Sequence, residues 1–111
     1  MLIHTDHNGV CVNAISSDAG DNVEGHLYHI QAGLQSSTIQ FQLGAVATNK
    51  VNGVTNEALL AILLHRTKFL DSKFPCDENK RAIQHMEEAL VNLEVRTARR
   101  MVRGVEGREV A

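Results

Sequence analysis

The chain has no tryptophan, a single proline and only two cysteines among its 111 residues. Cys11 and Cys76 form no CxxC pair, and isolated thiols of this kind are typical of a reducing compartment rather than of a disulfide-stabilised domain. No apolar run approaches the ~20 residues that span a bilayer. The first residues also lack the basic-then-apolar layout of a signal peptide. We therefore expect a cytoplasmic protein with no membrane partner.

Basic residues are missing from the first part of the chain. Residues 1–49 contain no lysine or arginine and four acidic residues, so their formal charge is −4, whereas residues 50–111 contain eleven basic and nine acidic residues and carry +2. A general binder of duplex DNA is expected to be more basic overall. The concentration of positive charge in one place favours a small anionic ligand, and we do not expect long nucleic acid as a partner.

Short alternating segments separated by Gly, Asn, Asp and Ser indicate strands and turns in residues 1–49. These segments are LIHT, GVCVNAI, HLYHIQA and STIQFQLG. The clearest strand is predicted at residues 38–44, where the apolar residues 39, 41 and 43 share one side. The stretch SSDAGDN is expected to form an exposed turn or loop.

The pattern changes to a helical period after residue 54. Thr55 is the expected N-cap of a first helix that runs to about Asp71, with an inner stripe of Leu59, Ile62, Leu63, Arg66, Phe69 and Leu70. Pro75 separates this helix from the next. The second helix is predicted from Asp77 or Glu78 to Gly104, with an inner stripe of Ile83, Met86, Leu90, Leu93 and Thr97.

These elements predict an α+β fold. A small N-terminal antiparallel β-sheet (residues 1–53) would precede an antiparallel two-helix hairpin with a C-terminal Arg/Gly tail (residues 54–111), together one compact domain. The second helix is the longer, so its C-terminal end should extend past its partner. Such a chain supplies a thin core, and several apolar residues lie off the inner stripes. We therefore expect self-association to bury Leu60, Leu64, Val91, Val95 and Val102.

Four arginines fall on one face near the end of the second helix: Arg96, Arg99, Arg100 and Arg103, at i, i+3, i+4 and i+7. No acidic residue lies three or four positions before any of them. Each like-charged pair at this spacing costs about 0.2–0.5 kcal/mol. Either the face is merely solvated, or it binds an anion with several oxygens, for which the planar guanidinium suits phosphate. The tail that follows, Gly104, Val105, Glu106 and Gly107, could close over such an anion.

Phe69, Asn79 and Arg96 together offer a ring, an amide and a guanidinium plane. Recognition of a nucleobase uses such groups, the planes for stacking and the amide for hydrogen bonding. Asn79 and Arg96 would be about 25 Å apart along one helix, so a shared site would have to form between protomers. The alternative is that Phe69 packs in the core and Asn79 is a polar residue of a first helical turn.

Motifs for catalysis or for metal and cofactor binding are lacking. His4-x-x-His7 and His26-x-x-His29 resemble metal-ligand spacings, but residues three apart on a strand point to opposite faces. There is no Walker loop, no GxGxxG, and no Ser or Cys arrangement for a catalytic triad. We therefore expect no enzyme activity, no catalytic residue, no metal and no cofactor.

The chain also resembles a known family through TIQFQLG, VNGVTNEALL, the FPCxEN turn, EEAL and RTxxRxxRGVEG, across residues 38–107. These motifs are similar to those of the phage anti-Thoeris sponges, which share a helical-hairpin domain with phage anti-CBASS sponges. The resemblance implies a non-enzymatic phage counter-defence protein of the host bacterial cytoplasm. It would sequester cyclic nucleotide immune signals, notably glycocyclic ADP-ribose, and in some members cyclic oligonucleotides at a separate site.

The same resemblance implies dimers or higher homo-oligomers, a hexamer among them. It places Phe69, Asn79 and Arg96 in a cyclic ADP-ribose pocket and makes the segment from Arg99 to Gly107 a candidate second site. Residues 1–37 are longer than the shared pattern, and the resemblance assigns them no role. Two other functions remain open: a phosphodiesterase that degrades the same signals, and a nucleic-acid-binding regulator that uses the arginine face.

Overall fold

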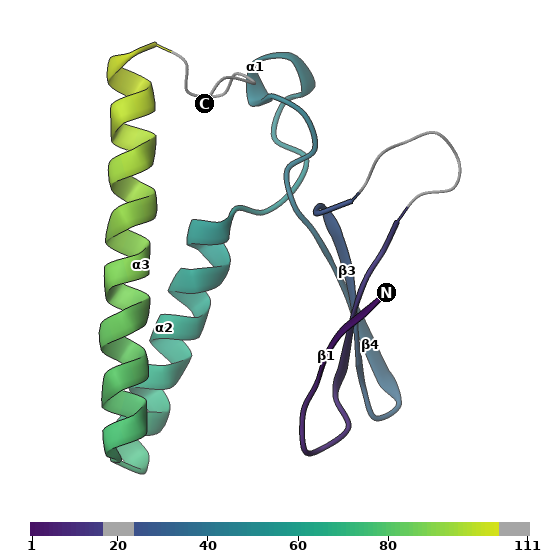
Figure 1. Cartoon of the computed structure of the whole chain (residues 1–111), viewed down its shortest axis with the longest axis vertical. Coiled ribbons are helices and arrows are strands. Elements are labelled where there is room, and N and C mark those ends of the chain that lie inside the picture. The colour runs from purple at the N-terminus through teal and green to yellow at the C-terminus, as the bar shows by residue number, and fades with distance from the viewer. Residues whose placement is uncertain (17–23, 105–111) are drawn as a thin grey trace. The chain divides into compact units, whose positions relative to one another are not determined.

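The computed structural model describes residues 1–16 and 24–104 (Figure 1). The chain divides into two compact units, Met1–Val54 and Thr55–Ala111, which are described separately below. Most of the predicted SSDAGDN loop lies outside the described residues. No helix in the described part is long and apolar enough to cross a membrane.

The first unit contains a four-stranded antiparallel sheet in the order β1-β2-β3-β4. Its strands are β1 (Leu2–Thr5), β2 (Cys11–Ala14), β3 (Leu27–Ala32) and β4 (Gln35–Gln40). Together with the two long packed helices of the second unit, this sheet confirms the predicted α+β class. The register aligns Ala14 with Tyr28 and Tyr28 with Ile39, so these three side chains share one face.

The predicted strand at residues 38–44 is displaced, because β4 runs from Gln35 to Gln40. The partner strand sets this limit: β3 begins at Leu27, which pairs with Gln40, so no ladder remains for the following residues. Phe41 instead forms a parallel bridge with Val54. The side chain of Gln42 turns to the loop, where its Oε1 accepts from the Asn52 N–H (2.9 Å) and its Nε2 donates to the Lys50 carbonyl (2.7 Å).

The loop between Gln42 and Asn52 contains the short helix α1 (Val46–Asn49). Asn52 closes the loop from the other end: its Oδ1 accepts from the Leu43 N–H and its Nδ2 donates to the Leu43 carbonyl, both at 2.8 Å. Backbone groups of Leu43, Gly44, Lys50 and Asn52 thus find side-chain partners where strand pairing is lacking. The five side-chain–backbone bonds of Gln42 and Asn52 hold this loop in one shape.

The turn between β1 and β2 depends on the carboxylate of Asp6. Its Oδ1 accepts from the N–H groups of Asn8 (2.8 Å) and Val10 (3.0 Å). The hydrogen bond from the Val10 N–H, with a smaller one from Asn8, lowers the pKa of Asp6 below its ordinary value of 3.8. The ionised carboxylate therefore stabilises the folded turn.

A pH dependence follows from this turn. Because the pKa of Asp6 is lower in the folded than in the unfolded chain, its contribution is complete above the ordinary pKa and is lost as the pH falls through the folded value. We expect the melting temperature of wild type to fall more steeply below pH ~4 than that of Asp6→Asn. The asparagine keeps an acceptor oxygen but does not titrate. If the melting temperatures of the two proteins fell equally with decreasing pH, this role for Asp6 would be contradicted.

The second unit is a hairpin of α2 (Asn56–Lys73) and α3 (Asp77–Val102). Thr55 is the N-cap of α2, as predicted, and its hydroxyl accepts from the Ala58 N–H at 3.1 Å. Side-chain caps of this kind contribute typically ~1 kcal/mol. Helix α3 has 26 residues against 18 in α2. Its C-terminal turns therefore extend past α2 (Figure 1).

The inner face of α3 was predicted correctly, whereas that of α2 was predicted correctly only at Leu59 and Leu70, which are half-buried. Half-buried residues of α3 follow the expected stripe through Leu90, Leu93 and Thr97. On α2, however, Ile62 and Leu63 are 63% and 53% exposed, while Leu60 and Leu64, which we had placed off the stripe, are half-buried. Apolar residues surround α2 almost evenly, so the helical period alone could not select the packed face.

The described residues contain no fully buried apolar side chain. In the hairpin the exposed large apolar residues are Ile62, Leu63, Phe69, Phe74, Val91, Val95, Met101 and Val102. Single exposed apolar residues are normal, but several on one small helical pair are typical of an interaction surface.

Candidate functional site

The four arginines of the predicted face come together in the structure. Arg96, Arg99 and Arg100 lie in the last turns of α3, and Arg103 is its C-cap. They line a pocket of about 330 Å³ together with Asn92 and Val95. The helix rises only 5.4 Å per turn, so residues three, four and seven apart bring their side chains to one surface.

Arg100 differs from its neighbours in burial. Its side chain is 6% exposed, whereas Arg96, Arg99 and Arg103 are exposed. Arg100 follows Thr97 by three residues and Leu93 by seven, so it continues the inner stripe of α3. One wall of the pocket therefore carries a buried guanidinium, and the exposed guanidinium groups surround it.

The electrostatics of this pocket favour an anion. The C-terminal end of a helix carries a partial negative charge, which stabilises cations in the last turn. Four guanidinium groups concentrate far more positive charge than that partial charge offsets. An anion with several oxygens could bind two or more of these groups bidentately. The pocket is suited to phosphate or pyrophosphate.

Asn92 and Val95 were not predicted as site residues. Asn92 lies four residues before Arg96, and Val95 lies four before Arg99, so both occupy the preceding turn of the same surface. The Asn92 Nδ2 donates to the Glu88 carbonyl at 3.0 Å. The Asn92 Oδ1 therefore points away from the Glu88 carbonyl. Because each lies four residues before an arginine of this face, the sequence could have identified both residues as neighbours of the site.

Phe69 lies near the opposite end of the hairpin. The residue is 48% exposed, and the Lys73 Nζ lies 4.9 Å from the centroid of its ring. The alternative that Phe69 is a core residue is therefore wrong for a single chain. An exposed aromatic face beside a lysine is available for stacking.

Asn79 lies in the first turn of α3, close to the turn that joins the helices. Its N–H donates to the Sγ of Cys76 at 3.4 Å, and its Nδ2 is 3.5 Å from the Phe74 carbonyl. The Asp71 carboxylate fixes the same turn, since it accepts from the Cys76 N–H at 3.2 Å and from the Lys80 Nζ at 3.3 Å. The side-chain amide of Asn79 therefore lies at a turn whose shape is held by these hydrogen bonds.

The structure does not bring Phe69 and Asn79 together with Arg96 in one chain. Asn79 and Arg96 are separated by 17 residues of one continuous helix, which is about 25 Å. Gly104 follows α3 with a φ of +71°, and its N–H donates to the Met101 carbonyl at 3.0 Å. Val105, Glu106 and Gly107 lie outside the described residues.

The described part of the chain shows no metal site. Within residues 1–16 and 24–104, no three His, Cys, Asp or Glu side chains gather in a way that could hold a metal ion. His85 lies 3.8 Å from Glu88 on an exposed face of α3, outside the arginine pocket.

Comparison with known proteins yields one strong likeness. No family model matches the chain. A protein of Bacillus phage SBSphiJ7, described as Thoeris anti-defense 1, is 50% identical to the chain over 72 residues. The match covers 64% of this chain and 51% of that protein, so the chain spans about half the length of the curated relative. The chain is thus a homologue, over the matched part, of a phage protein that acts against Thoeris defence.

Proposed function

We propose that the protein binds and sequesters a cyclic nucleotide immune signal in the host bacterial cytoplasm and so counteracts Thoeris defence. The observation that carries this proposal is the 330 Å³ pocket lined by four arginines at the end of α3. The likeness to a phage protein described as Thoeris anti-defense 1 supports the counter-defence role. The sequence motifs of the sponge family support the ligand class.

Glycocyclic ADP-ribose is the ligand that best fits the groups available. It carries a pyrophosphate, for which arginine forks supply charge-assisted hydrogen bonds, and an adenine, which can stack on an aromatic or guanidinium plane. Arg96 offers both interactions, while Phe69 and Asn79 offer a ring and an amide. Arg99, Arg100 and Arg103 provide further charge for a second, cyclic oligonucleotide ligand.

A complete cyclic ADP-ribose site requires two protomers in this proposal. The turn end of one hairpin carries Phe69 and Asn79, and the distal end carries Arg96 about 25 Å away. An antiparallel arrangement of two hairpins would place the turn end of one beside the distal end of the other. The exposed Ile62 and Leu63 of α2 offer an apolar surface for that contact.

A panel of ligands tests the function. Purified protein is incubated with cyclic ADP-ribose isomers, cyclic dinucleotides, cyclic trinucleotides and linear ADP-ribose, and the melting temperature is measured. We expect a clear rise with at least one cyclic nucleotide, since a ligand that binds only the folded state stabilises it by about 2.7 kcal/mol at one hundred times its Kd. Equal rises with linear and cyclic compounds, or none at all, would contradict the proposal.

Self-association is a separate prediction. We expect native mass spectrometry at low micromolar concentration to show dimers or larger assemblies of the 12.2 kDa chain. Leu63→Glu should shift the population towards monomer, because a carboxylate in an apolar interface is costly to desolvate. His65→Glu, at an exposed position of the same helix, is the matched control and should leave the assembly unchanged. A wild-type spectrum dominated by monomer would contradict the two-protomer site.

A further inference from the structure

A second pocket lies in the N-terminal sheet. It has a volume of about 500 Å³ and lies where the start of β1, the end of β2 and the start of β3 meet. This volume is within the range of pockets that bind small organic molecules. Its lining residues all belong to the unit Met1–Val54; they are Met1, Ile3, Ala14, Ile15, Ser16, Glu24, Gly25 and Tyr28.

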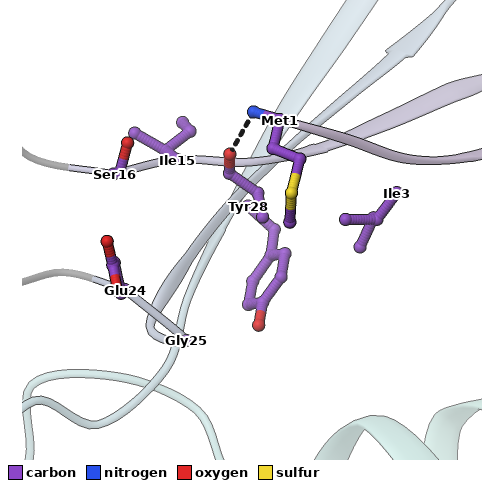
Figure 2. A pocket seen from close by; sticks show the side chains of 8 residues that line it. Met1, Ile3, Ile15, Ser16, Glu24, Gly25 and Tyr28 are labelled. Atoms are coloured by element: carbon purple, nitrogen blue, oxygen red, sulfur yellow. Dashed lines mark hydrogen bonds between the residues drawn. The ribbon is translucent and has the colours of Figure 1, made fainter.

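The frame of this pocket is held by backbone pairing. The Met1 nitrogen donates to the Ala14 carbonyl, and the Ala14 N–H donates to the Met1 carbonyl, both at 2.8 Å (Figure 2). The Ile15 N–H donates to the Leu27 carbonyl at 3.0 Å, which extends the pairing of β2 with β3. Gly25 has a φ of +77°, a conformation that glycine adopts without strain. These bonds hold the Met1, Ala14 and Ile15 side of the pocket in place.

Tyr28 forms the centre of the pocket, and its ring orientation is fixed. Phe41 packs against it edge to face, with the ring centroids 5.6 Å apart and the planes at 84°. In Figure 2 the Tyr28 ring stands in the middle of the group, with Ser16 and Glu24 on one side of it and Ile3 on the other. The pocket thus has a polar side, an aromatic centre and an apolar side.

The charged groups of this pocket balance each other. No lysine or arginine is in the lining, whose charged groups are the N-terminal ammonium of Met1, bonded to the Ala14 carbonyl, and the carboxylate of Glu24. One positive and one negative charge leave no net charge to attract a phosphate. A carboxylate accepts hydrogen bonds from the amino groups of nucleobases, while an aromatic ring stacks on any base. The ligand chemistry indicated is an uncharged planar heteroaromatic ring that bears an amino group.

We propose that this sheet pocket binds an amino-bearing nucleobase, which would lie against the Tyr28 ring and donate its amino group to Glu24. The inference does not depend on the proposed function, because the arginine pocket lies in the other unit and is lined by four cationic side chains. The base could come from a free nucleoside or from a nucleotide, and the two sources differ in their phosphate.

Tyr28 also allows a specific test, since it is the one tyrosine in the sequence. The full-length protein is labelled at tyrosine, so its ring gives a single set of NMR signals, and adenosine is titrated in. We expect a saturable shift of these signals with a Kd on the order of 0.1 mM, as is usual for ligands of this size. Inosine, which carries an oxo group in place of the amino group, should bind about tenfold more weakly.

Two variants and one nucleotide complete the experiment. Glu24→Gln should weaken adenosine binding about tenfold, since a charged acceptor is replaced by a neutral one. Ile3→Trp should fill the pocket and abolish the shift, whereas Leu34→Trp, at a fully exposed position of the same unit, should bind as wild type. AMP should bind no more tightly than adenosine. A shift absent with adenosine, equal for inosine, unchanged in both pocket variants or much tighter for AMP would overturn the proposal.

Discussion

Arg96→Glu is expected to abolish binding of cyclic ADP-ribose isomers while the hairpin stays folded. Arg96 is an exposed residue of α3 that lines the arginine pocket, so a glutamate fits there without steric conflict. Charge-assisted hydrogen bonds contribute about 1.5–3 kcal/mol each, and loss of two such bonds weakens binding by about a hundredfold or more. The reversed charge repels the pyrophosphate in addition.

The matched control for this variant is Arg81→Glu. Arg81 lies on the same helix, is exposed and forms an ion pair with Glu78 at 3.8 Å, which at such a surface site contributes little. The control therefore makes the same change of net charge outside the pocket. Calorimetry should show near wild-type affinity for Arg81→Glu and no binding for Arg96→Glu. Equal affinities of the two variants would remove Arg96 from the site.

Gly53→Ala is expected to have the largest effect on stability. A Cβ at Gly53 would lie 2.4 Å from the Phe41 carbonyl carbon and 2.7 Å from the Gln40 oxygen. Both obstacles are backbone atoms, so no rotamer change can relieve the overlap, and the bridge between Phe41 and Val54 must separate. We expect a loss of about 3 kcal/mol, the upper end of the usual cost of overpacking.

Hydrogen exchange of individual amides shows where Gly53→Ala destabilises the chain. The Val54 N–H donates to the Gln40 carbonyl at 2.9 Å, and the Gln42 N–H donates to the Val54 carbonyl at 3.1 Å. Both amides should exchange much faster in Gly53→Ala. Gly33→Ala serves as the control, since its Cβ meets no atom within 4 Å and its cost is confined to a φ of +62° in a remote turn. Unchanged protection of Val54 and Gln42 in Gly53→Ala would contradict the steric account.

The sequence allowed good prediction of the elements whose signals are local. The Thr55 cap, the start of α3 at Asp77 and the inner stripe of α3 were all predictable, because caps are local signals and α3 has one distinct apolar face. Helix α2 has apolar residues on all sides, so its packed face depends on its partner. The limits of β4 likewise depend on where β3 begins.

The two pockets also differ in how far the sequence could predict them. The four arginines fall at helical spacing, so the sequence predicted that they share one face, and there they line a pocket. Met1, Ala14 and Tyr28 are far apart in the sequence and meet through the register of three strands, which no short-range pattern specifies. The proposed grouping of Phe69 and Asn79 with Arg96 depends on a second protomer and stays a prediction.

The proposal requires that the ligand leave the protein chemically unchanged. Cleavage of a phosphodiester or glycosidic bond needs a nucleophile, an activated water or a positioned acid and base. The arginine pocket offers guanidinium groups, which do not exchange a proton readily at neutral pH, together with Asn92 and Val95. Tight binding of the ground state also contributes no rate acceleration. The described lining of this pocket supplies none of these groups, as the proposal of sequestration requires.

Recovery of the ligand tests the central claim most directly. The protein is incubated with an excess of glycocyclic ADP-ribose, separated from the unbound fraction and heat-denatured, and both the released material and the unbound fraction are analysed by chromatography. The account predicts intact cyclic ligand in both, with a released amount that does not exceed about one equivalent per protomer and is near zero for Arg96→Glu. Linear or hydrolysed product that accumulates beyond one equivalent per protomer would contradict sequestration and show that the protein is an enzyme.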